Sequence, residues 1–132
     1  EFIPNNALHI NGHLVGYGGN SGAYYWYGPG AMLPPGNYTA TFRVNATSTG
    51  TQPVATLEVA TGITPQAVAS KNVSETNGIE NVTVRFSLEH TQTNVEFRAK
   101  EAGGEGRIAF ENVTVESVGG PTIHLRPQNA ST

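Results

Sequence analysis

The sequence predicts an all-β protein, an antiparallel β-sandwich of the jelly-roll type with about ten short strands. Apolar and polar residues alternate with a period of two along most of the chain, as they do in half-buried antiparallel strands. Clusters of Gly, Pro, Asn and Ser separate the alternating segments. No segment repeats apolar residues at helical spacing over three turns, so no helix is expected.

The expected strands follow one another closely. Residues 8–15 and 23–27 are extended but irregular, and regular alternation starts at residue 38. Glu96 and Arg98 alternate with apolar neighbours, so we expect this pair on an outer face. The residues expected to face the core are Tyr38, Ala40, Phe42, Val44, Ala55, Leu57, Val59, Val82, Val84, Phe86, Leu88, Val95, Phe97, Ala99, Ile108, Phe110, Val113, Val115, Ile123 and Leu125.

Turn-forming residues divide the chain and bound the domain. In the first cluster two prolines fix φ, and Gly36 permits a backbone angle that would strain other residues. We expect one sandwich domain over residues 10–118, an extended segment over 1–9 and a strand or tail over 119–132. Residues 1 and 2 are either a mature terminus or a remnant of cloning. The turn clusters lie at 34–36, 48–50, 76–78 and 103–104.

The composition excludes several classes of protein. Charged residues make up 13% of the chain, and seven Lys and Arg give no basic stripe for nucleic acid. The absence of Cys excludes disulfides, thiolate catalysis and cysteine-based zinc sites. All ten acidic residues are Glu, which argues against sites built on Asp. No apolar run approaches the roughly 20 residues that a membrane-spanning helix needs.

No cofactor or catalytic site is expected. His9 and His13 would point the same way from a strand but lie about 13 Å apart, too far for one metal ion. A structural calcium ion would depend on Glu58 or Glu111. The chain has no nucleophile elbow, no zinc-protease motif and no phosphate-binding loop, so we expect that it is not an enzyme.

Six Asn-x-Ser/Thr sequons indicate export from the cell. If Asn, Ser and Thr were placed independently along a chain of this composition, roughly two sequons would be expected. Each sequon is an acceptor for a surface glycan in a secretory route, although outer strand faces rich in Asn and Thr also produce sequons by composition. Both interpretations predict an extracellular or cell-surface β-protein. The sequons begin at Asn37, Asn45, Asn72, Asn81, Asn112 and Asn129.

Five segments carry a resemblance to a known family, in the order 27–29, 33–43, 54–59, 84–88 and 95–98. Their order resembles the galactose-binding-domain-like jelly rolls of carbohydrate-binding modules and of extracellular archaeal and bacterial proteins. The resemblance covers roughly residues 10–118. It implies the fold, and it implies either a sugar-binding role or a structural role, because such domains include both.

The aromatic run Tyr24-Tyr25-Trp26-Tyr27 is the candidate ligand site. Aromatic rings stack on the apolar faces of sugars, and alternation along a strand would place Tyr24 and Trp26 on one face with Tyr25 and Tyr27 on the other. One pair is expected in the core and the other at a ligand. The alternative is that both pairs serve packing, with satisfied polar atoms.

The Gly-rich segment 16–22 is the second part of the candidate site. Its four glycines allow a backbone to approach a ligand closely, and Tyr17 and Asn20 could contact it. His13 and Arg107 could join the site. The alternative is a flexible connection between strands.

Two functions follow from these features. The first is a non-catalytic extracellular module that binds carbohydrate through Trp26, Tyr24, Tyr17 and Asn20 and is attached to a larger glycan-active or surface protein. The second is a glycosylated structural subunit of an extracellular filament or surface layer. In that case the terminal segments would pair with a neighbour's sheet edge.

Overall fold

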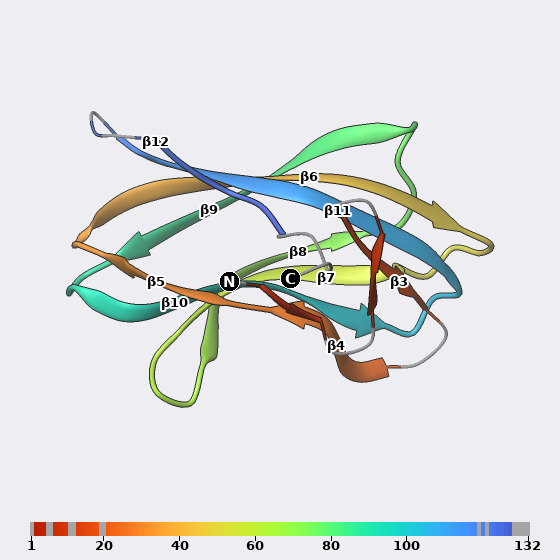
Figure 1. Ribbon diagram of the computed structural model, residues 1–132, viewed down its shortest axis with the longest axis horizontal. Helices are drawn as coiled ribbons and strands as arrows, with labels where there is room; N and C mark the ends of the chain where they lie inside the picture. Colours follow the sequence, from red (N-terminus) through yellow and green to blue (C-terminus); the bar gives the residue numbers. More distant parts are fainter. Residues whose placement is uncertain are drawn as a thin grey trace.

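A computed structural model describes residues 2–4, 7–10, 13–18, 21–118, 120 and 122–127, and for 8–10 and 21–23 it describes the backbone only. These residues form two six-stranded sheets that lie face to face (Figure 1). Every strand pair within them is antiparallel. No helix occurs in the described ranges, and therefore none that could cross a membrane.

Sheet A has the strand order β1–β4–β10–β7–β8, and β5 also pairs with β10. The longest strand of this sheet, β10, is central and pairs with β4, β5 and β7. The strands of sheet A are β1 (Ile3–Pro4), β4 (Ser21–Tyr27), β5 (Pro29–Leu33), β7 (Ala55–Thr61), β8 (Gln66–Val73) and β10 (Gln92–Ala102).

Sheet B has the order β2–β3–β11–β6–β9, and β12 also pairs with β11. The chain passes repeatedly between the sheets, from β8 in sheet A to β9 in sheet B, back to β10 and on to β11. This crossing confirms the predicted antiparallel β-sandwich of the jelly-roll type. The strands of sheet B are β2 (Ala7–Ile10), β3 (His13–Tyr17), β6 (Gly36–Ser48), β9 (Ile79–Leu88), β11 (Gly106–Ser117) and β12 (Thr122–Leu125).

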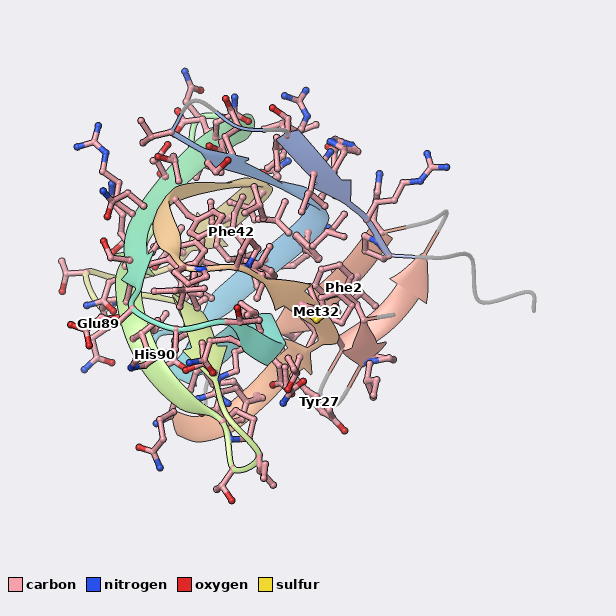
Figure 2. The ribbon with its side chains drawn as sticks, turned by 90° about the vertical axis from the view of Figure 1, so that its left-hand side faces the viewer. Phe2, Tyr27, Met32, Phe42, Glu89 and His90 are labelled. Atoms are coloured by element: carbon pink, nitrogen blue, oxygen red, sulfur yellow. The ribbon has the colours of Figure 1, made fainter. Side chains whose placement is uncertain are left out.

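Alternation along the strands builds the core as predicted. In β6, every second side chain from Tyr38 to Ala46 is buried, while the side chains between them face outward. Phe42 of β6 contacts Phe97 of β10 edge-on, with ring centroids 6.5 Å apart, so this pair joins the two sheets. Figure 2 shows Phe42 between the sheets. Of the residues expected in the core, only Val82, Ile123 and Leu125 are partly exposed.

The described parts of both terminal segments pair within the chain. β1 pairs with β4, and β12 pairs with β11. Phe2 is 2% exposed and meets Phe110 edge-on with centroids 5.0 Å apart, so it fills part of the core (Figure 2). Within the described residues, both segments are therefore edge strands of the chain's own sheets.

Candidate functional site

The outer face of sheet A carries a cluster of one aromatic and four charged side chains, which we call the charged platform. Val95, Phe97 and Ala99 of β10 face the core, so the residues between and after them face outward. The strands β4 and β7 pair with β10 on its two sides and supply the remaining members. The charged platform consists of Tyr24, Glu58, Glu96, Arg98 and Lys100.

An ion pair forms the centre of the charged platform. Arg98 and Glu58 are opposite each other in the β10–β7 register, and Arg98 Nε lies 2.8 Å from Glu58 Oε1. The two side chains are only 10% and 11% exposed, although they lie on an outer sheet face. Glu96 Oε1 lies 3.9 Å from Arg98 Nη1. The predicted outer-face pair of Glu96 and Arg98 is therefore present, but the shorter contact of Arg98 is to Glu58.

The ring of Tyr24 lies beside this ion pair. The guanidinium carbon of Arg98 is 4.5 Å from the ring centroid, and Lys100 Nζ is 6.0 Å from it. These are distances at which a cation interacts with the ring quadrupole. Arg98 is thus held by two carboxylates and an aromatic ring, which fixes the orientation of its planar group.

The platform continues across the sheet as a row of polar side chains. The register aligns Tyr24, Lys100, Thr56 and Asn72 across four strands, a width of about 14 Å. Thr56 Oγ1 donates a hydrogen bond to Asn72 Oδ1 at 2.8 Å. Such a row can hydrogen-bond several hydroxyl groups of an extended ligand.

The connection between β7 and β8 stands beside this face. Figure 1 shows the hairpin in yellow-green, projecting from sheet A away from sheet B. Asn94 of β10 donates from Nδ2 to the Gly62 carbonyl at 2.8 Å and so fixes the base of the hairpin. Ile63 follows and is fully exposed. The hairpin can therefore bound a ligand that lies on sheet A.

Trp26 does not share a face with Tyr24, and the predicted pairing of these two residues is wrong. In the β4–β10 register, Trp26 is opposite Ala99 and Tyr24 is opposite Lys100, so Tyr25 is an extra residue in a β-bulge. The bulge interrupts alternation and turns both Tyr25 and Trp26 inward. Trp26 is 0% exposed and stacks on Phe110 with centroids 4.6 Å apart, so its ring presents no surface to a sugar in this structure.

The glycines near residue 16 make room for Tyr25. A Cβ on Gly16 would overlap the ring of Tyr25, and one on Gly18 would come within 2.9 Å of the Tyr25 hydroxyl. That hydroxyl donates to the Val54 carbonyl at 2.8 Å. At these two positions the absence of a side chain therefore serves packing, which was neither the expected ligand loop nor the alternative of a flexible connection.

Burial raises the pKa of the Tyr25 phenol from 10.0 to about 12, and the nearby charge of Glu101 adds to this rise. Between pH 10 and pH 12, the Tyr25 phenol keeps its proton in the folded state and loses it in the unfolded state. The contribution of Tyr25 to the free energy of unfolding should therefore fall by about 1.4 kcal/mol per pH unit over this range. Below pH 10 this contribution is fully present. Urea unfolding at a series of pH values measures the slope.

The variant Tyr25→Phe is the control for this pH dependence. It should lose about 1 kcal/mol at neutral pH, because the Val54 carbonyl loses its donor. Above pH 10 its stability should fall less steeply than that of the unmodified chain. Parallel curves for the two proteins would show that Tyr25 does not cause the loss.

The other predicted site residues are not brought to the charged platform. Tyr17 is 55% exposed and is opposite Arg107 in the β3–β11 register, on the outer face of sheet B. Tyr17 and Tyr24 therefore lie on opposite faces of the sandwich. His13 is half-buried at the start of β3. Asn20 lies outside the described residues.

A groove of about 580 Å³ lies at the start of β6 and the end of β9 and contains no platform residue. Tyr38 and Phe86 stack there with centroids 5.1 Å apart, and Ser87 Oγ donates to Asn37 Oδ1 at 2.7 Å. Both rings are buried, and the amide oxygen of Asn37 already accepts a hydrogen bond. The groove is lined by Asn37, Tyr38, Thr39, Val68, Arg85, Phe86, Ser87 and Val118.

Separately, no three His or Glu side chains within the described ranges lie close enough together to hold a metal ion.

The fold is a jelly-roll β-sandwich of the kind found in carbohydrate-binding modules. It is similar to a solved structure described as "CBM4 structure and function", with a TM-score of 0.51 and 15% sequence identity. The similarity covers 89% of this chain and 81% of that one. At this identity it is a similarity of fold. No protein-family model matches the chain, and no curated protein matches it.

Proposed function

We propose that this chain is a non-catalytic carbohydrate-binding module that binds a glycan on the charged platform. The observation that carries the proposal is the Glu58–Arg98–Tyr24 cluster, which places a polar network and an aromatic ring side by side on an outer face. The module would act outside the cell and be attached to a larger glycan-active or surface protein. The similar fold of a carbohydrate-binding module supports this function.

The chemistry of the platform fits a sugar. Carboxylate and guanidinium groups form directional hydrogen bonds with hydroxyl groups, and an aromatic ring packs on the C–H face of a pyranose. Because Arg98 is already held by Glu58, Glu96 and Tyr24, binding would cost little side-chain entropy. The two glutamates and the two basic side chains balance in charge, which suits a neutral ligand.

The carboxylates of the platform suit binding better than catalysis. Glycoside hydrolysis needs one carboxyl group that donates a proton and a second that acts as nucleophile or base. Glu58 and Glu96 both contact the same cation, Arg98, so the two carboxylates do not have the contrasting environments that an acid and a base require. We therefore assign them to hydrogen bonding with the ligand.

A pair of tyrosine variants tests the proposal. Tyr24→Ala should weaken binding of an oligosaccharide selected on a glycan array by more than about tenfold, a loss of about 1.4 kcal/mol in titration calorimetry. Tyr17→Ala is the matched control, because Tyr17 is exposed on the opposite face, and it should leave the affinity unchanged. Full affinity in Tyr24→Ala, or binding lost only in Tyr17→Ala, would contradict the platform site.

One observation favours the structural alternative. β8 forms an edge of sheet A, most of its side chains are exposed, and Lys71 is its only charged residue. Edge strands with few charges can pair with another chain. Light scattering separates the two functions, because a filament subunit would assemble with increasing concentration and a binding module would stay monomeric.

A further inference from the structure

We infer that the outer face of sheet B is a glycan-bearing face, with N-linked glycans at Asn37, Asn45, Asn81 and Asn112. The sequons at these positions come from three neighbouring strands, β6, β9 and β11. In each of them the middle residue, at 38, 46, 82 or 113, points inward, so the Asn and the following Thr share the outer face.

The register places three of the four sequons together. Arg43 of β6 is opposite Asn81 of β9 on one side and Asn112 of β11 on the other. The two Asn residues are therefore two strand spacings apart, about 10 Å. Asn45 lies two residues further along β6, about 7 Å from Arg43. Three glycans would stand over the middle of this face.

The exposure of these side chains allows attachment. Asn37 and Asn81 are exposed, and Asn45 and Asn112 are half-buried. The hydrogen bond from Ser87 Oγ to Asn37 uses the carbonyl oxygen Oδ1. Glycosylation takes place on Nδ2, so this bond can persist in the modified protein. We expect the highest occupancy at the two exposed positions.

The distribution of sequons between the two sheets supports the inference. All four Asn residues on the outer face of sheet B are followed two residues later by Thr. The strands β4, β5, β7 and β10 of sheet A contain no sequon, although β10 contains Asn94. Asn72 on the edge strand β8 is the exception within the described strands of sheet A. Asn129 lies outside the described residues.

Glycans confined to the outer face of sheet B, which we call a one-sided coat, would limit which surfaces of the protein can contact other molecules. Bulky glycans on sheet B would block docking on that face and hinder pairing along the edge strand β9, which carries Asn81. The outer face of sheet A would remain open when Asn72, which ends the polar row across that face, carries no glycan. If the proposed function holds, the glycans thus leave the charged platform accessible to its ligand.

Mass spectrometry of the natively produced protein tests the inference. Intact mass counts the glycans, and enzymatic release in ¹⁸O water converts each occupied Asn to a labelled Asp that peptide mapping locates. We expect label at Asn37 and Asn81 and at one or both of Asn45 and Asn112. An unmodified mass, or label confined to Asn72 or Asn129, would overturn the inference. This result does not depend on whether the protein binds sugar.

A designed sequon on sheet A provides the matched control. In a glycosylating secretory host, Ser70→Asn/Asn72→Thr places an acceptor on β8 opposite Glu58, beside the charged platform, and leaves the five platform residues unchanged. Its glycan should abolish ligand binding, whereas the same variant made in a host without N-glycosylation should bind. Enzymatic release from the four sheet B positions should leave the affinity of the natural sequence unchanged. Affinity that rises when the sheet B glycans are removed would contradict the one-sided coat. Absence of binding in every form would instead reject the proposed function.

Discussion

Trp26→Ala is expected to lower the free energy of unfolding by about 3–5 kcal/mol. Trp26 is fully buried, and its ring stacks on Phe110 at 4.6 Å while Tyr25 packs beside it at 6.3 Å. Phe2 reaches the same cluster through Phe110. Removal of the indole leaves a cavity between the sheets that these aromatic neighbours can fill only in part. The loss should lower the melting temperature by roughly 10–20 °C.

Thermal and urea unfolding measure this effect, and Tyr24→Ala is the matched control from the same strand. Tyr24 is half-buried on the outer face, so its removal should cost less than about 1 kcal/mol. The two variants should therefore affect different measurements: Trp26→Ala destabilises the fold, and Tyr24→Ala weakens ligand binding. An unchanged melting temperature in Trp26→Ala, together with lost binding, would place the sugar on Trp26 instead.

The fold could be predicted because apolar and polar residues alternate regularly along most of its long strands. In β6, β9 and β10, apolar residues at every second position identify the buried face without knowledge of the strand order. β5 and β8 were not predicted, because β5 is interrupted by Gly and Pro and β8 carries apolar and polar side chains on exposed positions of both faces. Their positions depend on pairing with β10 and β7, which a local pattern does not encode.

The candidate site could be predicted only in part, for two physical reasons. The bulge at Tyr25 shifts the phase of β4, and alternation alone therefore assigned Trp26 to the wrong face. Arg98 was expected on an outer face, but its closest partner, Glu58, lies 40 residues away in the sequence. Contact between Arg98 and Glu58 depends on the register of β7 against β10. That register is set by burial of the apolar face of each strand in the core of the whole domain.

Arg98→Met is expected to destabilise the fold by roughly 2–4 kcal/mol, because it leaves the carboxylate of Glu58 nearly buried without its cation. About a tenth of each side chain remains exposed, so the cost should lie toward the lower part of the range for buried pairs. The apolar stem of Met retains most of the packing of the Arg stem. The measured loss should therefore report the unpaired charge of Glu58.

A double-mutant cycle with Glu58→Gln separates this charge effect from lost packing. The double variant should recover part of the stability that Arg98→Met loses, because no buried charge remains unpaired. Arg43 and Glu111 on sheet B offer the comparison: their atoms lie 3.4 Å apart, but the side chains are 45% and 21% exposed. Arg43→Met should cost less than about 1 kcal/mol, since solvent screens the pair. If Arg98→Met and Arg43→Met cost the same, the burial of the Glu58–Arg98 pair does not contribute to stability, and the platform would not be held in the ordered state that glycan binding requires.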